Sequence, residues 1–425
     1  MRPHLKTSLI VTLLSASFLS AVLIYALRKT AQETEVRIDA TEDLRGLGYS
    51  GQRKIAVDSA GNIFAAYRKK YRGKSEIFVA KISRQKNEWL ASGTDVPIAA
   101  VGKKSDQRVP SIDIDSKDRV HVIWYGADSD SEIDNRQIKY SRSIDGGATW
   151  SSWKNIAPVD GYGGEDYWQE HPHLLVGDND VLFAVWEGKD ANHPKQQIKF
   201  SRSDDGGATW IHWKNVRTTP DNTQSRPTIV QERSGRLHLL MYSSFGNSDD
   251  RQQIQHGWSD DSGESWNGWQ AVSDPVSDSR HVSAALGPNG KLHIAWRSQD
   301  ASGYSQIVYR SLENGAWSEI ITVAPSSINQ FFPSIGIDDD GKSSIAWMES
   351  EEPSNLPNEN PPDGKIRVAD SSSGTFSLLE TSGNNSASLY PHLPEKLGRE
   401  DPPLIFESFG SRSKEYVIYL KFIRK

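Results

Sequence analysis

One short pattern recurs along the chain at nearly constant spacing. It reads Ser-x-Asp-x-Gly-x-Thr/Ser-Trp, and its three full copies span residues 143–150, 203–210 and 259–266. Divergent copies at 83–89, 311–317 and 371–376 keep the same phase. The closing aromatic residues stand 51 to 61 residues apart, which suits one four-stranded sheet and its loops. The chain is therefore predicted to repeat one small β unit several times.

The residue types in this pattern are those of a tight turn. An Asp side chain can accept backbone N–H groups of its own turn, and Gly permits the positive φ that a hairpin needs. The Trp restarts a strand and packs beside the hairpin. We therefore assign a structural role to the residues of the full copies: Ser143, Asp145, Gly147, Trp150, Ser203, Asp205, Gly207, Trp210, Ser259, Asp261, Gly263 and Trp266.

A second repeat, a strand–turn–strand hairpin, occurs seven times, at 54–67, 110–124, 172–186, 227–241, 282–296, 333–347 and 391–406. A third strand follows each hairpin. The last unit lacks a fourth strand, and the β-like segment 35–40 is the candidate to supply it. The prediction is an all-β fold: a seven-bladed β-propeller of four-stranded antiparallel blades over 35–425, with the N-terminal strand closing the last blade. Six blades, with the C-terminal segment packed elsewhere, is the alternative.

The N-terminus carries an apolar run at residues 8–27, flanked by basic residues. Twenty residues at about 1.5 Å each span about 30 Å, the thickness of a bilayer core. We expect a short flank at 1–7, a transmembrane signal anchor at 8–27 and a linker at 28–34. The propeller would then lie in the periplasm or at the cell surface. A cleaved signal peptide, which would release a secreted protein, is the alternative.

Composition excludes some functions. The net charge of −6 offers no basic face for nucleic acid, and the absence of cysteine excludes disulfides, thiol catalysis and cysteine metal ligands. No cofactor and no catalytic metal are predicted. Asp128, Asp130, Glu132 and Asp134 crowd one loop and could bind calcium, although such a run is more often a solvated loop tip.

The positions at the expected mouth of the central channel differ from blade to blade, while the strands beside them stay regular. Positions that only pack should repeat one residue type, so this divergence predicts a site. The catalytic candidates, which could act as acid or base or pass protons, are Glu187, Glu407, Tyr125, Tyr242, His171 and His281. The ligand-binding candidates are Arg53, Arg68, Arg108, Glu170, Arg226, Arg280, Arg297, Phe332 and Tyr390.

The chemistry of these side chains favours an anionic ligand. Arginine can clamp a carboxylate or sulfate with two hydrogen bonds. The competing interpretation is an ion-pair network that only seals the mouth.

The repeat and its spacing resemble the Asp-box of the sialidase superfamily over nearly the whole segment after residue 34. The resemblance implies a propeller whose ligand is a glycan and, for a sialidase, an arginine triad, a Tyr–Glu nucleophile pair and an Asp acid/base. The chain departs from that pattern. Arg53-Lys54-Ile55 replaces Arg-Ile-Pro, and the loop 68–76 contains no Asp. Arg226 and Tyr242 stand where the family carries an activating Glu and an Arg.

True sialidase activity is therefore not expected. Seven-bladed relatives with similar boxes include polysaccharide lyases such as ulvan lyases, and some glycoside hydrolases. We expect the mouth to recognise an acidic carbohydrate or glycoconjugate. The alternatives are a lyase or non-sialidase hydrolase that uses the Arg, Glu, His and Tyr side chains, and a non-catalytic platform for protein partners.

Overall fold

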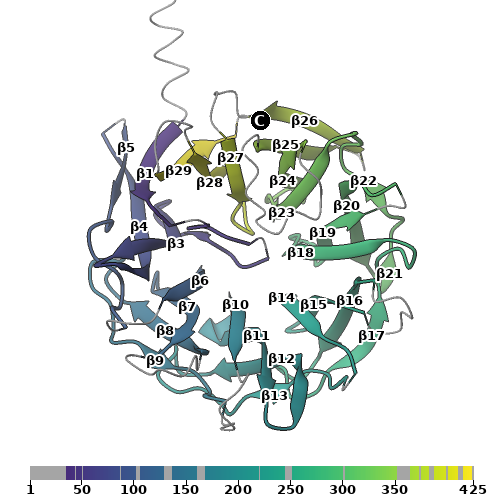
Figure 1. Ribbon diagram of the computed structural model, residues 1–425, viewed down its shortest axis with the longest axis horizontal. Coiled ribbons are helices and arrows are strands. Elements are labelled where there is room, and N and C mark those ends of the chain that lie inside the picture. The colour runs from purple at the N-terminus through teal and green to yellow at the C-terminus, as the bar shows by residue number, and fades with distance from the viewer. Residues whose placement is uncertain are drawn as a thin grey trace, which may run out of the picture. The chain divides into compact units, whose positions relative to one another are not determined.

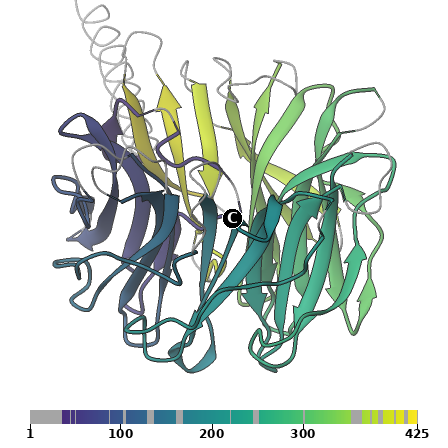
Figure 2. The ribbon, with the colours of Figure 1, turned by 60° about the horizontal axis from the view of Figure 1, so that its bottom comes forward.

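Seven antiparallel sheets stand around a central channel in the part of the chain that the structure describes (Figure 1). This computed structural model describes residues 35–43, 45–49, 51–86, 88–101, 106–128, 136–159, 168–219, 221–244, 251–299, 302–351, 364–372, 375–381, 387–398, 401–409 and 415–423. Each sheet is one blade, and its strands follow one another from the centre outward. Figure 2 shows the ring tilted, with turns and loops gathered at its two faces.

The blades share one layout, an inner strand followed by three further strands. Their bounds are β2 (Ile55–Val57), β3 (Ile63–Tyr71), β4 (Lys74–Gln85), β5 (Glu88–Ser92); β6 (Gln107–Ile114), β7 (Val120–Ala127), β8 (Arg136–Ser143), β9 (Lys154–Asn155); β10 (Gln169–Val176), β11 (Leu182–Asp190), β12 (His193–Ser203), β13 (Lys214–Asn215); β14 (Gln224–Gln231), β15 (Leu237–Ser243), β16 (Gln253–Ser259), β17 (Asn267–Ala271); β18 (Asp278–Leu286), β19 (Leu292–Gln299), β20 (Ser305–Glu313), β21 (Ala316–Trp317); β23 (Asn329–Ile337), β24 (Ser343–Ser350), β25 (Lys365–Ser372), β26 (Thr375–Thr381); and β27 (Ala387–His392), β28 (Pro403–Phe409), β29 (Tyr416–Phe422). Two short elements complete the set, the 3-10 helix η1 (Asp178–Asp180) and β22 (Ile321–Thr322), which pairs with β20.

The N-terminal strand closes the ring. The last blade has the strand order β1-β29-β28-β27, so β1 (Glu35–Thr41) is its outer strand. The predicted seven blades and the predicted closing strand are confirmed, and the six-bladed alternative is excluded. Closure covers sheet edges that would otherwise be open to pairing with other chains.

The predicted anchor at 8–27, its flank and its linker lie outside the described residues. In the described part, no helix has the length and apolar character needed to cross a bilayer.

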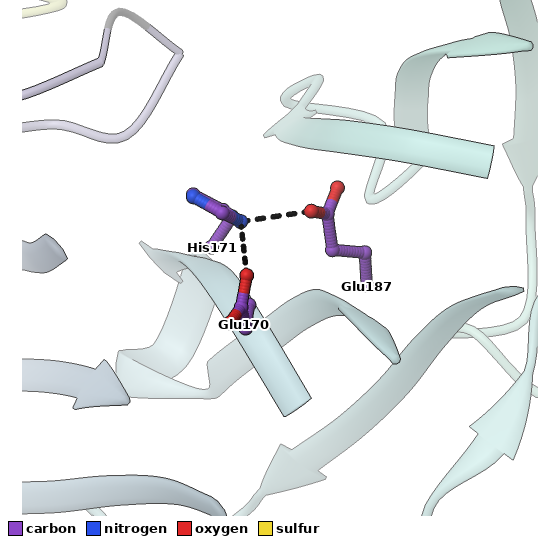
Figure 3. Close-up of side chains that lie close together, drawn as sticks. All are labelled: Glu170, His171 and Glu187. Carbon is purple, nitrogen blue, oxygen red and sulfur yellow. Dashed lines mark hydrogen bonds and ion pairs between the residues drawn. The ribbon is translucent and has the colours of Figure 1, made fainter. Parts of the chain in front are cut away.

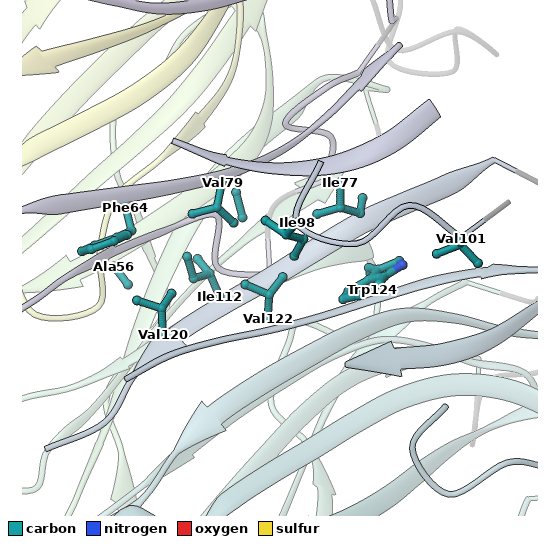
Figure 4. Close-up of a cluster of buried hydrophobic side chains, with 11 residues drawn as sticks. Ala56, Phe64, Ile77, Val79, Ile98, Val101, Ile112, Val120, Val122 and Trp124 are labelled. Carbon is teal, nitrogen blue, oxygen red and sulfur yellow. The ribbon is translucent and has the colours of Figure 1, made fainter. Parts of the chain in front are cut away.

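The hydrophobic core lies between neighbouring blades. Figure 4 shows one such cluster, in which Phe64 and Val79 of the first blade meet Ile112, Val122 and Trp124 of the second. The other inter-blade clusters repeat this arrangement around the ring. Because each blade buries its faces against two neighbours, the ring is stabilised as a whole.

The turn pattern of the sequence folds as its residue types suggest. Ser143 Oγ donates to Asp145 Oδ1 at 2.7 Å, and Asp145 accepts the Thr149 N–H at 2.9 Å. The same bonds recur at Asp205 and Asp261. Hydrogen bonds from Thr149 hold the pKa of Asp145 down to about 2. The carboxylate is thus engaged within its own turn.

The inner strands are joined from blade to blade by hydrogen bonds that backbone N–H groups donate to the preceding blade. The bonds are Ile112 N–H to Arg53 O (3.0 Å), Leu174 N–H to Ser111 Oγ (3.1 Å), Ile229 N–H to His173 Nδ1 (2.9 Å), Ile335 N–H to Ser283 Oγ (3.2 Å) and Leu393 N–H to Ser334 Oγ (2.9 Å). We call this level of the channel the waist.

One substitution tests how the repeated Ser-x-Asp-x-Gly turns pack against the neighbouring blade. Gly207 has a φ of +86°, and a Cβ there would lie 2.0 Å from Tyr140 Oη of the preceding blade. Gly235 has a φ of +89° with nothing within 4 Å of an added Cβ. Gly207→Ala should lower the free energy of unfolding by about 1–3 kcal/mol more than Gly235→Ala, because only the former overpacks an interface. Denaturant unfolding of both variants measures this, and equal losses would contradict the packing described.

Candidate functional site

A bulge in the inner strands turns one side chain of most blades toward the mouth of the channel. The ladder between first and second strands shifts register at this point in six blades. The residue at the bulge has a positive φ, from 47° to 57°, which is uncommon for residues other than Gly. These residues are Val109, His171, Arg226, His281, Phe332 and Tyr390. Backbone strain of this kind concentrates at functional sites.

Tyr49 occupies the middle of this ring of bulge residues. It belongs to the connection between β1 and β2, drawn in dark purple, which runs into the centre of the ring (Figure 1). The Tyr49 ring lies edge-on to His171 and Phe332, with centroids 5.2 and 6.2 Å apart, and tilted against His281 at 6.4 Å. Arg45 Nη1 donates to its hydroxyl at 2.8 Å.

Arg226 lies directly against Tyr49. Its Cζ stands 4.0 Å from the centre of the Tyr49 ring, a cation–π contact. Within the described residues, Arg226 Nε and Nη1 are buried and make no hydrogen bond. Tyr125 and Tyr242 are its other polar neighbours. A buried guanidinium with open donors is suited to receive an anion in two-point geometry.

Glu187 and His171 form a buried pair beside Arg226, shown in Figure 3. His171 Nδ1 lies 2.8 Å from Glu187 Oε1 and 3.5 Å from Glu170 Oε2. Glu187 Oε2 accepts the Arg226 N–H at 2.6 Å, and Arg136 forms an ion pair with Glu170. Burial raises the pKa of Glu187 to about 8.

Three of these groups have the donor types of a metal site. One ligand atom each from Glu170, His171 and Glu187 lies within 4.8 Å of the others. The hydrogen bond between His171 and Glu187 and the Arg136 ion pair explain the same grouping without a metal. The expectation that no metal is required stays a prediction.

His281 and Tyr242 line another part of the mouth, and their rings lie 6.0 Å apart and nearly perpendicular to each other. Burial and the nearby Arg297, Arg226 and Arg280 hold the pKa of His281 well below its usual range, so its imidazole is neutral. Its Nδ1 is buried and has no hydrogen-bond partner in the described part of the chain.

Asp278 engages the two arginines next to His281. Arg280 Nε lies 2.7 Å and Arg297 Nη2 3.6 Å from its Oδ2. This part of the mouth matches the ion-pair network that the sequence left as an alternative, while Arg226 does not belong to it.

The β1–β2 connection, which carries Tyr49, lies over the part of the mouth that Glu407 and Arg68 form. Glu407 is fully buried and accepts the Leu47 N–H, and burial raises its pKa to about 7. Arg68 N–H donates to Gly46 O at 2.8 Å, and its Nε lies 3.7 Å from Asp43. Glu407 and Arg68 thus hold the chain's own segment. Phe332 and Tyr390 are buried, with their rings 5.2 Å apart.

Two ligand-binding candidates differ from the expectation. Arg53 faces away from the mouth, pairs with Glu395 and lies 3.4 Å from Asp113. It lines a cavity of about 750 Å³ at the end where the first and second strands turn. The cause is register: Lys54 O accepts the Ala66 N–H, so Lys54 and not Arg53 stands at the level of Ser111. Arg108 lies on the rim, half-exposed, 3.8 Å from Asp106.

Of the four calcium candidates, Asp128 alone lies among the described residues. Asp128 is engaged by Lys139 Nζ and by Asn155 Nδ2, the latter at 2.9 Å. Asp130, Glu132 and Asp134 lie outside the described residues. Calcium binding stays a hypothesis.

The residue that the sequence did not identify is Tyr49. Its signal was its position, since it stands a few residues before β2, the first strand of a blade. No role was predicted for the connection between the segment 35–40 and the first hairpin, so its contribution to the mouth was missed.

Comparisons with known proteins agree with the fold. The family described as BNR repeat-like domain matches residues 180–356. The chain is similar to an ulvan-degrading polysaccharide lyase solved with a GlcA–Rha3S unit, with 13% identity, 89% of this chain and 96% of that chain covered, and a TM-score of 0.59. A second polysaccharide lyase is similar with 11% identity, 90% of this chain and 91% of that chain covered, and a TM-score of 0.58.

A structure described as a Hadza microbial sialidase is similar with 14% identity, 87% of this chain and 74% of that chain covered, and a TM-score of 0.53. No sequence among curated proteins matches the chain. The predicted propeller fold is confirmed, and BNR repeat-like sequence is shown for residues 180–356. At these identities the likeness to solved structures concerns the fold.

Glu187 provides a test of the buried pair. Its pKa rises on folding from 4.5 to about 8, so the folded state binds more protons than the unfolded state between these values. This residue should therefore reduce stability as pH rises through that window. Glu187→Gln removes the titration while keeping the size of the side chain. Relative to the parent, the variant should gain stability from about pH 5 to about pH 8 in denaturant unfolding. A difference that does not change with pH would contradict the assignment.

Proposed function

We propose that this propeller recognises an acidic carbohydrate at the channel mouth, with Arg226 as the group that binds a carboxylate. The observation that carries the proposal is the state of Arg226. Its Nε and Nη1 atoms are buried without a hydrogen bond among the described residues. Arg280, Arg297 and Arg68 all lie near carboxylates of the chain itself. A planar guanidinium with two open donors matches a carboxylate better than it matches a neutral hydroxyl.

The surroundings of Arg226 fit a sugar. Tyr49 and Tyr242 present aromatic rings next to it, and Phe332 packs against Tyr49. His171 and His281 add polar edges. Ligand sites combine such apolar surfaces with a few polar groups that fix orientation. Tyr49 lies over Arg226 in this structure, so an entering carboxylate has to share or replace that contact.

The comparisons support the choice of an anionic ligand. A lyase of similar fold is described as bound to a glucuronate–rhamnose sulfate unit, which carries both a carboxylate and a sulfate. The similar sialidase is a carbohydrate-active protein as well. This support is by analogy of fold, and Arg226 gives it a specific residue.

A second candidate function, β-elimination of a uronate polysaccharide, is favoured by the neutral His281. With the carboxylate on Arg226, His281 Nδ1 would take the proton from the adjacent carbon. The bond from the β-carbon to the glycosidic oxygen would break, and that oxygen would receive a proton from Tyr242. Burial raises the pKa of Tyr242, which keeps its hydroxyl protonated.

We further propose that the propeller works outside the cytoplasm on a membrane anchor. The apolar run at 8–27 and its basic flanks support this. Such a position would bring the mouth to polysaccharide at the cell envelope or cell surface.

Removal of the Arg226 guanidinium should weaken binding of an oligoglucuronate at least about 10-fold, because a charge-assisted hydrogen-bond pair is lost. Isothermal titration of the parent and of Arg226→Gln measures the change. The matched control is Arg202→Gln. This change also removes one positive charge, but from a side chain that pairs with Glu264 beside the repeated Ser-x-Asp turns. Equal weakening in both variants would contradict a specific role for Arg226.

The carboxylate itself is tested with a ligand in which each uronate is reduced to the neutral sugar. The parent protein should bind this ligand more weakly by a similar factor, and Arg226→Gln should no longer distinguish the two ligands. If the parent protein binds both ligands alike, the ligand is not recognised through its charge.

Elimination is tested by ultraviolet absorbance of the unsaturated product formed from uronate polysaccharides. The second candidate predicts product with the parent protein and a loss of at least about 100-fold in His281→Asn, the scale of general-base contributions. Binding without product in the parent protein would leave recognition as the function.

A further inference from the structure

Basic and aromatic side chains continue outward from the mouth over the second and third blades. Arg108 lies near the start of β6, and Arg136 is the first residue of β8. Trp168 directly precedes β10, and Lys189 lies near the end of β11, where its N–H donates to Trp168 O at 3.1 Å. All four positions are at the mouth ends of their strands. We call Arg108, Arg136, Trp168 and Lys189 the outer cluster.

The Trp168 ring brings two cations of the outer cluster close together. Arg136 Cζ and Lys189 Nζ each lie 5.9 Å from the centre of this ring, so at most twice that distance separates them. All three side chains are partly exposed. The indole attracts each cation, but the two like charges repel each other. An anion bound between them would relieve that repulsion.

The described carboxylates at the outer cluster do not outnumber its cations. Asp106 lies 3.8 Å from Arg108, and Glu170 forms an ion pair with Arg136. The outer cluster itself carries three cations. Among these described side chains, the charge is therefore positive.

Two further carboxylates at this end of the second and third blades have cations of their own. Lys139 Nζ donates to Asp128, and Lys199 Nζ donates to Asp190 at 2.6 Å. Both lysines are fully buried. Asp128 and Asp190 are thus balanced within their own blades and do not offset the outer cluster.

Tyr125 connects the outer cluster with Arg226. It stands opposite Arg108 in the ladder between β6 and β7. Burial raises the pKa of Tyr125, while the charges of Arg108, Arg226 and Arg136 act in the opposite direction. Three guanidinium groups thus lie within electrostatic reach of one buried hydroxyl group. They form a continuous positive path from the centre of the mouth toward its rim.

We propose that the outer cluster is a second subsite, which binds a further anionic sugar of the chain whose carboxylate binds Arg226. This inference rests on the proposed function, since it extends the same site. The ligand is then a polysaccharide with a carboxylate or sulfate on each repeat, and not a single terminal sugar. A neutral polysaccharide would leave the repulsion between Arg136 and Lys189 unrelieved.

Oligoglucuronates of two and six sugars test the second subsite, with affinities measured by isothermal titration. The dimer is expected to fill the Arg226 site alone. The parent protein should bind the hexamer about 10-fold more tightly, because two exposed ion pairs contribute about 3-fold each. Arg108→Gln combined with Lys189→Gln should remove this gain and leave the affinity for the dimer unchanged.

The matched control combines Arg202→Gln with Lys214→Gln. It removes the same two kinds of charge, but from side chains that pair with Glu264. This variant should keep the preference of the parent protein for the hexamer. A hexamer can bind in more than one register in both double variants, so the difference between them reports the subsite.

Equal weakening of dimer and hexamer in the outer-cluster variant would overturn the inference. A parent protein that binds the hexamer no more tightly than the dimer would overturn it as well. In both cases, weaker dimer binding by Arg226→Gln would still support the proposed function. If Arg226→Gln binds the dimer as the parent protein does, the proposed function fails, and the inference fails with it.

Discussion

The hydrogen bonds between adjacent inner strands determine how this molecule presents its side chains. At the waist, a backbone N–H of one blade donates to Ser111, His173, Ser283 or Ser334 of the blade before it. Directly above this level the inner strand bulges in six of the described blades, and the bulge residue takes a positive φ. The waist therefore keeps neighbouring strands in register, while the bulge is free to carry a different residue in each blade. A regular scaffold thus supports an irregular mouth.

That division explains the chemistry at the mouth. Residues at the bulge are held in a strained backbone conformation, so their side chains are positioned in advance instead of by a ligand. Most charges there are already balanced: Asp278 holds Arg280 and Arg297, and Arg136 holds Glu170. Arg226 is the exception, since an aromatic ring and not a carboxylate lies against it. An anion that enters the mouth would find a guanidinium that no carboxylate of the described residues engages, and it would have to share or replace the Tyr49 contact.

The sequence was sufficient for the architecture because the boxes and hairpins repeat. Seven blades, the closing strand β1 and the local bonding of Asp145 all follow from residue types whose interactions lie within one blade. It was less informative where position depends on chain path. Arg53 was placed one residue out of register, since the first blade lacks the Pro that follows the bulge in blades such as Arg226-Pro227. Tyr49 was missed because only the threading of the β1–β2 connection brings it to the centre.

A structure of the protein with an acidic oligosaccharide tests the central claim most directly. The expected result is one uronate carboxylate within about 3 Å of the Arg226 guanidinium in two-point geometry, with the sugar ring next to Tyr49. The contrary result is an oligosaccharide bound on the rim, or in the cavity of about 750 Å³ at the opposite end of the channel, with Arg226 and Tyr49 left in contact as they are here.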